Sequence, residues 1–332
     1  MKATSIMFHE FGNPEEVLRL VNKSVKPPST GEILVRMKMS PINPSDLIPI
    51  RGAYAHRISL PTIPGYEGVG VVEEVGPSVS QDLIGKRVLP LRGEGTWQGL
   101  VRAPAELAVP IPDSIEDHIA AQLYINPMTA WVTCTEILEL GPGDVLVMNA
   151  AGSAIGRIFA QLSQIIGFQF IAVTRNNHYT DELLQLGAAH VIDTSNTSLQ
   201  EMVMELTDGR GASAAIDSIG GTEGTKLAFC VRPNGNFLTI GLLSGIPIQW
   251  KKVSESTKLN IKLFHLRHWN AKVSVQTWQE TFQTLIHLIE NKSLTLGVPD
   301  SFYPIEKVKK AVRAAESTSR NGMKVFLTFG LE

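Results

Sequence analysis

The sequence predicts an α/β protein whose central part is a doubly wound parallel sheet. Residues 145–176 have the pattern of an apolar strand, a turn of small residues, an amphipathic helix and a second apolar strand. Strand-like and helix-like runs then keep alternating, at 190–194, 198–206, 213–220 and 236–243. This alternation is typical of a parallel sheet covered by helices on both faces, the Rossmann arrangement.

The turn between the first strand and the helix predicts a dinucleotide site. The segment Ala151-Gly152-Ser153-Ala154-Ile155-Gly156 has the spacing of G-x-G-x-x-G, with Ala and Ser at two of the three glycine positions. Small residues there allow a pyrophosphate to approach the backbone at a helix N-terminus. On this motif alone, a structural βαβ unit without a ligand is the alternative.

The second strand of this unit ends in Thr174-Arg175-Asn176. NAD-binding proteins usually carry an acidic residue near this point, where it binds the ribose 2′-hydroxyl. A cation such as Arg175 suits a 2′-phosphate instead, so the sequence predicts NADPH as the cofactor. A solvated arginine at a strand end is the alternative interpretation.

Composition and charge narrow the class of protein. The chain of 332 residues is long enough for two domains, and its 43% hydrophobic and 19% charged residues are ordinary for a soluble globular protein. The formal net charge of −2 gives no reason to expect nucleic acid as a partner. We find no apolar run of membrane-spanning length and no signal-peptide pattern, so we expect no membrane span and a cytoplasmic location.

The cysteines and histidines do not predict a metal site. Cys134 and Cys230 lie in apolar helical patterns, where we expect them to fill the core. Two thiols are too few for a disulfide framework or for a structural zinc lobe of four cysteines. The eight histidines show no ligand spacing, and we expect His265 and His268 at the surface or lining a pocket.

A second domain precedes the parallel sheet. Residues 1–120 contain short β-type runs punctuated by Gly and Pro, which predict a compact, irregular β domain. Beyond about residue 245 the alternation fades. We expect an amphipathic helix at 274–291, a second helix at 305–318 and a terminal strand at 323–329 that returns to the first domain. The expected domains are 1–122 with 268–332, and 123–267.

Four short strings carry a family resemblance. They are Pro41-Ile42-Asn43-Pro44-Ser45-Asp46-Leu47, Arg51-Gly52-Ala53-Tyr54, Gly95-Thr96-Trp97 and Asn126-Pro127-Met128-Thr129-Ala130-Trp131. With the order of the domains, they resemble the medium-chain dehydrogenase/reductase superfamily. Within it they are most similar to the NADPH-dependent 2-enoyl thioester reductases of mitochondrial type, with quinone oxidoreductases as near relatives. The resemblance implies a GroES-like β-rich catalytic domain beside the Rossmann domain. It also implies a homodimer formed by edge pairing of the cofactor sheets, for which 236–243 and the segment after it are candidates.

Zinc-dependent members of the superfamily offer a contrast. They place a cysteine near the position of Asn43 and a histidine in a G-H-E string, where this chain has Gly65-Tyr66-Glu67. Three protein ligands cannot be assembled from these residues, so we expect no catalytic metal. We expect Glu67 to be a buried structural acid rather than a lone ligand.

The resemblance implies that Tyr54 is the proton donor. Hydride attack on an enoyl thioester develops negative charge on the thioester oxygen, and the α-carbon is then protonated. A tyrosine keeps its proton at neutral pH and can supply it. Asn43 could orient the tyrosine or the substrate carbonyl. The alternatives are a loop aromatic at Tyr54 and an Asn-Pro turn former at Asn43, while Trp97 and Trp269 are expected to be packing aromatics.

The resemblance also implies which residues contact the cofactor. They are Asn126 and Thr129 against the nicotinamide; Gly152, Ser153, Ala154, Ile155 and Gly156 at the pyrophosphate; Thr174, Arg175, Asn176 and Asn177 near the 2′-phosphate; and Ile240, Gly241, Leu242, Leu243, Phe264, His265, Leu266 and Lys324. For Lys324 a surface cation near the C-terminus is the alternative. His265 stands where these reductases tend to have a tryptophan, which leaves the substrate preference open.

Three functions follow from these features. The leading hypothesis is NADPH-dependent reduction of the activated C=C bond of 2-enoyl thioesters, carried by CoA or acyl-carrier protein, with Tyr54 as the acid. The alternative is an NADPH:quinone oxidoreductase on the same scaffold. A third hypothesis is an NADPH-binding protein with little turnover, which would be expected to have lost its polar pocket residues.

Overall fold

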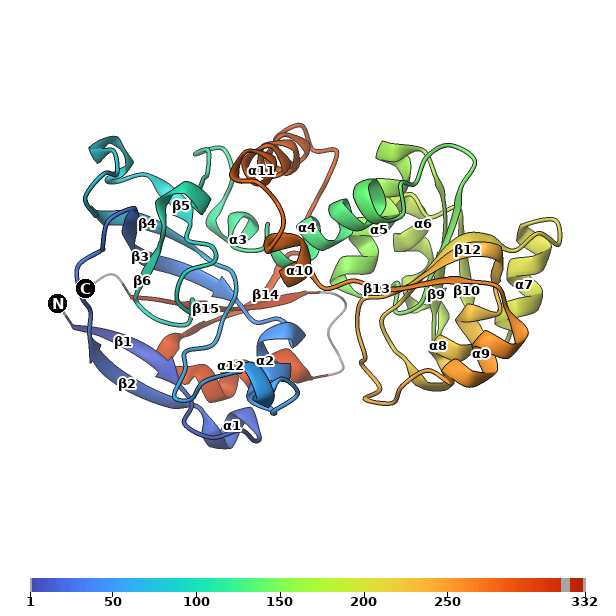
Figure 1. Cartoon of the computed structure of the whole chain (residues 1–332), viewed down its shortest axis with the longest axis horizontal. Helices are drawn as coiled ribbons and strands as arrows, with labels where there is room; N and C mark the ends of the chain where they lie inside the picture. Colours follow the sequence, from blue (N-terminus) through green and yellow to red (C-terminus); the bar gives the residue numbers. More distant parts are fainter. Residues whose placement is uncertain (1, 318–322, 331–332) are drawn as a thin grey trace. The chain divides into compact units, whose positions relative to one another are not determined.

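The computed structural model describes residues 2–317 and 323–330, and the chain divides into two compact units (Figure 1). Unit 1 comprises residues 1–125, 273–292 and 296–332, and unit 2 comprises residues 126–272 and 293–295. The domain boundaries expected from the sequence, at 122/123 and 267/268, lie a few residues from the boundaries of these units at 125/126 and 272/273. Position 318, the last of the helix expected at 305–318, lies outside the described residues, as do the chain ends.

The sheet of unit 1 is built around its longest strand, β3 (Glu32–Pro41). This strand pairs antiparallel with β4 (Val69–Val75), β6 (Leu100–Pro104) and β15 (Lys324–Thr328). The strand order is β14-β15-β3-β4-β5-β7, in which β14 is Pro299–Pro304, β5 is Arg87–Leu89 and β7 is Val109–Pro110. The last described strand therefore returns to the sheet that the first third of the chain forms.

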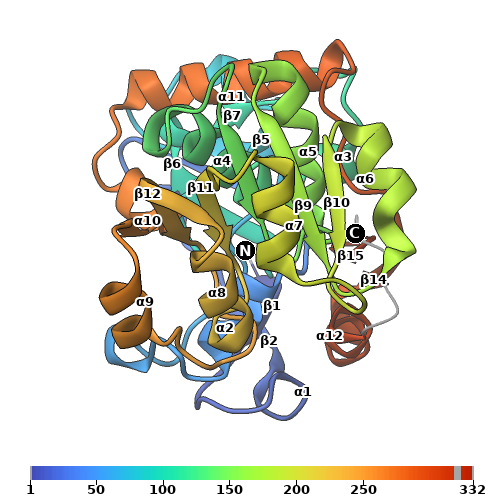
Figure 2. The same cartoon turned by 90° about the vertical axis from the view of Figure 1, so that its right-hand side faces the viewer.

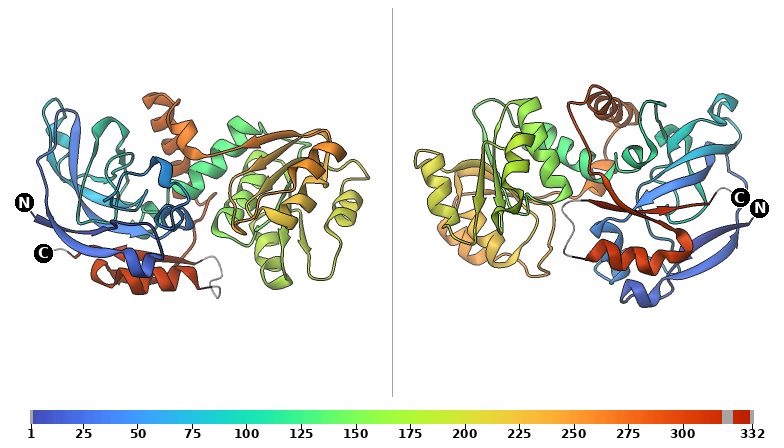
Figure 3. Two further views of the ribbon diagram at one scale, coloured as in Figure 1. Left: turned by 60° about the horizontal axis from the view of Figure 1, so that its bottom comes forward. Right: turned by 180° about the vertical axis from the view of Figure 1, so that it is seen from behind.

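Among the described residues, an antiparallel ribbon and five α-helices complete unit 1. The ribbon pairs β1 (Lys2–Met7) with β2 (Arg19–Ser24). The helices are α1 (Pro14–Val17), α2 (Pro44–Ile50), α3 (Asp117–Ala120), α11 (Val275–Glu290) and α12 (Val308–Glu316). Figure 3 shows α12 running beside β15, which it contacts. Helix α11 begins where the Ser274 hydroxyl accepts the N–H of Thr277, a standard N-cap.

The core of unit 1 is formed by the inward face of β3 and the aromatic residues around it. Ile33, Val35 and Met37 alternate along β3 and are buried, as period-2 patterning predicts for a strand with one face on the core. Trp97 is completely buried in the same cluster, which confirms the prediction that it is a packing aromatic.

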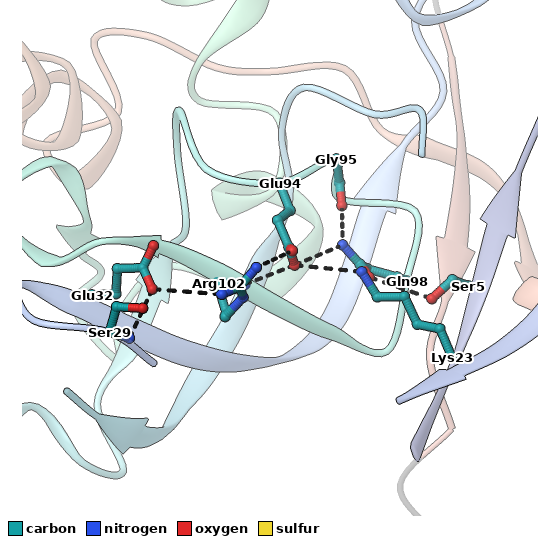
Figure 4. Close-up of polar contacts among 8 residues, drawn as sticks. All are labelled: Ser5, Lys23, Ser29, Glu32, Glu94, Gly95, Gln98 and Arg102. Carbon is teal, nitrogen blue, oxygen red and sulfur yellow. Dashed lines mark hydrogen bonds and ion pairs between the residues drawn. The ribbon is translucent and has the colours of Figure 1, made fainter. Parts of the chain in front are cut away.

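A polar network joins the ribbon of unit 1 to the loop before β6 (Figure 4). Glu94 lies between Lys23 of β2 at 3.6 Å and Arg102 of β6 at 2.8 Å, and Arg102 also reaches Glu32 at 3.8 Å. Burial raises the pKa of Glu94, but its hydrogen bond with Arg102 and the charges of Lys23 and Arg102 outweigh burial, so the net pKa is lowered. The network thus links β2 and β6 through Glu94.

Unit 2 is a six-stranded sheet in which every pairing is parallel. Its order is β10-β9-β8-β11-β12-β13, so the chain starts in the middle of the sheet and winds outward in both directions. The strands are β8 (Val145–Met148), β9 (Gln169–Thr174), β10 (His190–Asp193), β11 (Ala212–Asp217), β12 (Val231–Thr239) and β13 (Asn260–Leu263). This topology confirms the predicted doubly wound α/β fold.

Helices cover both faces of this sheet. The helices of unit 2 are α4 (Ile125–Val132), which begins at the last residue of unit 1, α5 (Ala154–Ile166), α6 (Thr180–Leu186), α7 (Leu199–Leu206), α8 (Gly221–Ala228), α9 (Trp250–Ser256) and α10 (Leu266–Asn270). Figure 2 shows α5 and α6 on one side of the strands and α8 and α9 on the other. Cys134 and Cys230 are completely buried, which confirms that they fill the core.

Of the two candidate segments for the edge of the cofactor sheet, the first is wrong. The segment 236–243 was a candidate for the edge of the cofactor sheet, but β12, which contains residues 236–239, pairs with β11 on one side and β13 on the other. The chain adds one more strand after it, because residues 260–263 continue the right-handed winding beyond β12. The edge is therefore β13, which lies in the second candidate segment, the one after 236–243.

No helix among the described residues is both long and apolar enough to cross a membrane.

Candidate functional site

The centre of the parallel sheet of unit 2 is a topological switch point. Strands β8 and β11 lie side by side, and the chain leaves them toward opposite edges of the sheet. In open α/β sheets, ligands bind at this switch point, outside the carboxyl ends of the strands. Here Asn149, just after β8, donates from Nδ2 to Oδ1 of the buried Asp217 at the end of β11, at 2.6 Å. This bond ties the two strand ends together.

The turn after β8 has the geometry that a pyrophosphate site needs. Ser153 caps α5, and its hydroxyl accepts the N–H of Gly156 at 3.3 Å. A Cβ at Gly156 would lie 2.2 Å from the carbonyl oxygen of Ala151, so only glycine fits there. Residues 152–155 are partly exposed, and the small residues Gly152, Ser153 and Ala154 leave the helix N-terminus approachable. The residues present therefore fit a dinucleotide.

A buried arginine that our sequence analysis missed supports this turn. Arg157 donates from Nε and Nη2 to the carboxylate of Glu182 at 2.6 and 2.7 Å, and from Nη1 to the carbonyl of Gly152. The ring of Tyr179 lies 5.1 Å from its guanidinium carbon and covers Gly152, where a Cβ would lie 2.5 Å from the ring. Arg157 thus joins α5, α6 and the turn. A charged residue in the apolar run 155–160 was the available signal.

The residues expected near a 2′-phosphate follow β9. Thr174 is buried and donates from Oγ1 to the carbonyl of Asn176 at 2.8 Å, which folds the chain back after the strand. The Asn176 side chain accepts the N–H of His178 at 3.1 Å. Arg175 and Asn177 are exposed. The loop is therefore fixed by its neighbours, while the guanidinium of Arg175 faces solvent at the ligand-binding edge of the sheet.

Two further expected segments follow the next strands of the same sheet. Residues 240–243 come after β12, where Ile240 and Leu243 donate their N–H groups to the carbonyls of Asp217 and Ser218 at 2.9 and 3.0 Å. The side chains of Leu242 and Leu243 are exposed. The structure thus brings 240–243 beside the end of β11, at the ligand-binding edge.

The segment 264–266 follows β13. Phe264 and Leu266 are buried, whereas His265 is half-buried and caps α10 by accepting the N–H of Arg267 at Nδ1. His268 is exposed. Trp269 is buried and donates to Glu136 at 2.8 Å, as expected of a packing aromatic. His265 therefore has a local structural role in capping a helix.

Helix α4 carries the two residues expected against a nicotinamide. Asn126 and Thr129 are three positions apart, so they share one face of the helix, and both are partly exposed. They are the first two polar side chains of an otherwise apolar segment.

Tyr54 lies in the loop of unit 1 that follows α2, and it is half-buried. The guanidinium carbon of Arg57 is 3.7 Å from the centre of its ring, a cation–π contact. Arg57 is not among the residues expected from the sequence, although the sequence places it three positions after Tyr54.

Asn43, Glu67 and Lys324 meet inside unit 1, far from solvent. Their exposed fractions are 2%, 2% and 6%. Lys324 donates from Nζ to Oδ1 of Asn43, and Asn43 donates from Nδ2 to Oε1 of Glu67 at 2.7 Å. The expectation that Glu67 is a buried acid fits this position. The amide of Asn43 is engaged at both ends, and Lys324 is buried rather than a surface cation.

In this cluster, burial and the attraction between opposite charges shift the pKa values in opposite directions. Burial raises the pKa of Glu67 and lowers the pKa of Lys324, and each charge offsets part of that effect on the other. All three groups that reach the Glu67 carboxylate are N–H donors, from Asn43, Tyr124 and Ile125, which suits an ionised acceptor.

Asp46 is a second buried carboxylate beside them. Its two oxygens accept the N–H groups of Asn43 and Tyr66 at 2.8 and 3.1 Å. Burial, together with the neighbouring charge of Glu67, raises the pKa of Asp46 to about 7. Asn43 is thus held by its backbone as well as by its side chain.

Within the described residues, no group of three or more His, Cys, Asp or Glu side chains is arranged to hold a metal ion. The two cysteines are not reactive thiols, because burial raises the pKa of Cys134 far above its usual range and that of Cys230 to about 12.

The fold and the site define a class, a two-domain oxidoreductase with a Rossmann nucleotide-binding unit. The comparisons agree with this class. Residues 29–113 match the alcohol dehydrogenase GroES-like domain, and residues 154–291 match the zinc-binding dehydrogenase family. The chain belongs to the medium-chain dehydrogenase/reductase superfamily.

Individual relatives are similar over nearly their whole length. The mitochondrial enoyl-[acyl-carrier-protein] reductase of Xenopus tropicalis is 31% identical, over 96% of this chain and 93% of its own. A Bacillus thuringiensis protein provisionally named as an NADPH:quinone reductase is 61% identical, with a TM-score of 0.97 and 99% of each chain covered. The Escherichia coli quinone oxidoreductase, solved with NADPH, has a TM-score of 0.88 at 24% identity over 98% and 99% of the two chains, a likeness of fold.

Proposed function

We propose that this chain is an NADPH-dependent reductase of quinone-type acceptors. The observation that carries the proposal is the 61% identity, over nearly the whole chain, with the Bacillus thuringiensis protein provisionally named as an NADPH:quinone reductase. From the sequence alone, enoyl thioesters are the leading hypothesis. Identity with the curated enoyl reductases is only 31%, so the quinone alternative now takes precedence.

Unit 2 supplies the cofactor site in this proposal. The turn 151–156 receives the pyrophosphate, Arg175 the 2′-phosphate, and α4 offers Asn126 and Thr129 to the nicotinamide. Bound NADPH supplies a hydride. Three features support this assignment. The turn is partly exposed, only glycine fits at position 156, and the guanidinium of Arg175 is exposed.

Unit 1 supplies the proton chemistry. A quinone that accepts a hydride becomes a hydroquinone anion, whose oxygen then takes up a proton. Because the acceptor oxygens hold this charge themselves, a strong enzymatic acid is not required. Tyr54, with Arg57 over its ring, would speed the proton transfer without being essential for it.

Enoyl thioesters remain the second candidate, because Tyr54 follows Arg51-Gly52-Ala53 as in the resemblance described above. Reduction of an enoyl thioester needs a proton at carbon, and Tyr54 is the group proposed to give it. The enzyme should therefore be assayed with NADPH and, in parallel, benzoquinone and crotonyl-CoA. The proposal expects the higher kcat/KM with the quinone. A higher kcat/KM with crotonyl-CoA would overturn it in favour of the second candidate.

We also propose a homodimer formed through β13 of unit 2. This edge strand is exposed along its whole length, with 44% of Ile261 and 72% of Leu263 accessible. An exposed apolar edge strand is a template for pairing with a second copy. Apart from this second copy, the partner we expect is a small-molecule acceptor. The cytoplasmic location stays a prediction from the sequence.

A further inference from the structure

The buried residues Lys324, Asn43 and Glu67 form a hydrogen-bonded chain with a fixed direction. Lys324 opens β15, Asn43 precedes α2, and Glu67 precedes β4, so the chain links three separate segments of unit 1. The amide of Asn43 presents its oxygen to the ammonium group and its nitrogen to the carboxylate. The reverse orientation would face donor to donor and acceptor to acceptor, so only one arrangement satisfies all three side chains.

The far end of this chain is the start of helix α4. The second carboxylate oxygen of Glu67 accepts the N–H groups of Tyr124 at 3.1 Å and Ile125 at 2.7 Å. Ile125 is the first residue of α4, and the first N–H groups of a helix have no partner within it. A carboxylate there also meets the positive end of the helix dipole. Glu67 thus fixes where α4 begins.

We infer that Glu67 is a positioning residue, which couples the buried charge of Lys324, through Asn43, to the helix that presents Asn126 and Thr129. This inference rests on the proposed function, in which those two side chains contact the nicotinamide. Asn126 is the residue after Ile125, so a shift of the first turn of α4 moves it directly. The Lys324–Asn43–Glu67 chain holds that turn still.

The chain permits an exchange that preserves every hydrogen bond. In the double variant Asn43→Asp/Glu67→Gln, a carboxylate at position 43 can accept from Lys324 with one oxygen and from the new amide with the other. The amide oxygen at position 67 can then accept the N–H groups of Tyr124 and Ile125. Either change alone breaks the pattern, because Glu67→Gln turns a donor toward backbone N–H groups and Asn43→Asp puts two carboxylates in contact.

The experiment measures the Tm, the Kd for NADPH, and kcat and KM for NADPH with benzoquinone, for both single variants and the double variant, well below every Tm. We expect each single variant to lose roughly tenfold in kcat/KM for NADPH, and the double variant to recover to within about threefold of wild type. Glu73→Gln is the matched control. Glu73 lies on β4 and pairs with Arg36 at 2.6 Å, and its replacement should leave the kinetics unchanged.

Single variants with a lower Tm but unaltered kcat, KM and Kd would overturn the inference and leave Glu67 a structural acid only. A double variant that recovers its Tm but not its kcat would also contradict it, because Asn43 would then act on the reactants directly. If the single variants do not fold, the double variant decides alone. If wild type reduces neither benzoquinone nor crotonyl-CoA, the proposed function fails, and the Kd for NADPH still tests the inference.

Discussion

The carboxylate of Asp46 accepts the backbone N–H of Asn43 at 2.8 Å, and both residues are 2% exposed. This contact is part of the capping box at the start of α2. Here it is buried beside Glu67, and the cost of a second buried negative charge raises the pKa of Asp46 to about 7. The carboxyl group therefore keeps its proton in the folded state well above the pH at which it loses it in the unfolded state.

Asp46 should make the protein less stable as the pH rises. Its pKa is raised from 3.8, so the stabilisation is present below about pH 4 and is lost as the pH rises through about 7. Asp46→Asn mimics the protonated form and should remove this loss. Urea unfolding of both proteins between about pH 5 and pH 8 tests this. A constant difference in unfolding free energy across this range would contradict the prediction.

Tyr54→Phe separates the two acceptor classes. Loss of the hydroxyl removes a proton donor, which should reduce kcat with crotonyl-CoA by roughly a hundredfold. With benzoquinone we expect a loss below about tenfold, because the hydroquinone oxygen can take its proton from water. Tyr303→Phe, a partly buried tyrosine of unit 1, is the control. Equal losses with both acceptors would show that Tyr54 acts on packing or binding rather than on proton transfer.

Arg175→Ala tests the preference for NADPH. A guanidinium–phosphate pair is a strong charge-assisted contact, so its removal should raise KM for NADPH roughly tenfold and leave KM for NADH unchanged. Arg210→Ala removes another exposed arginine of unit 2, which pairs with the exposed Asp208, and should change neither value. An unaltered NADPH/NADH ratio in Arg175→Ala would rule out the proposed role.

Leu263→Lys tests the dimer. A lysine on the exposed edge strand β13 places like charges across the proposed two-fold interface, which should convert the dimer to a monomer. Light scattering after size-exclusion chromatography gives the mass directly. Leu184→Lys, at an exposed leucine of α6, is the control and should stay dimeric. A wild-type monomer, or a dimer that survives Leu263→Lys, would contradict the proposal.

The parallel sheet was predictable because its signals are local. The alternating apolar runs and the small residues at 151–156 reflect burial on both faces and a tight turn, and both can be recognised within about thirty residues. Whether 236–243 or the segment after it forms the edge was not predictable, because a strand's neighbours depend on residues far away in the sequence, here the strand β13. The four residues of β13, Asn-Ile-Lys-Leu, are all exposed, and two alternating apolar positions are too few to predict a strand.

The buried polar groups were not predictable in their pairing. The Lys324–Asn43–Glu67 chain joins residues 281 and 24 positions apart, and nothing near any of them in the sequence indicates the others. Arg157 and Glu182 are likewise brought together only when α5 and α6 pack on the sheet. The types of these residues can be read from the sequence, but their hydrogen-bond partners are set by the tertiary fold.

The most direct test of the proposed function is a single turnover. Protein loaded with one equivalent of NADPH is mixed with excess benzoquinone or with excess crotonyl-CoA, and the loss of NADPH is followed against mixtures without protein. We predict that benzoquinone oxidises the bound NADPH faster than crotonyl-CoA and yields one hydroquinone for each NADPH consumed. Faster oxidation by crotonyl-CoA, or no acceleration over the protein-free mixture with either acceptor, would contradict the account.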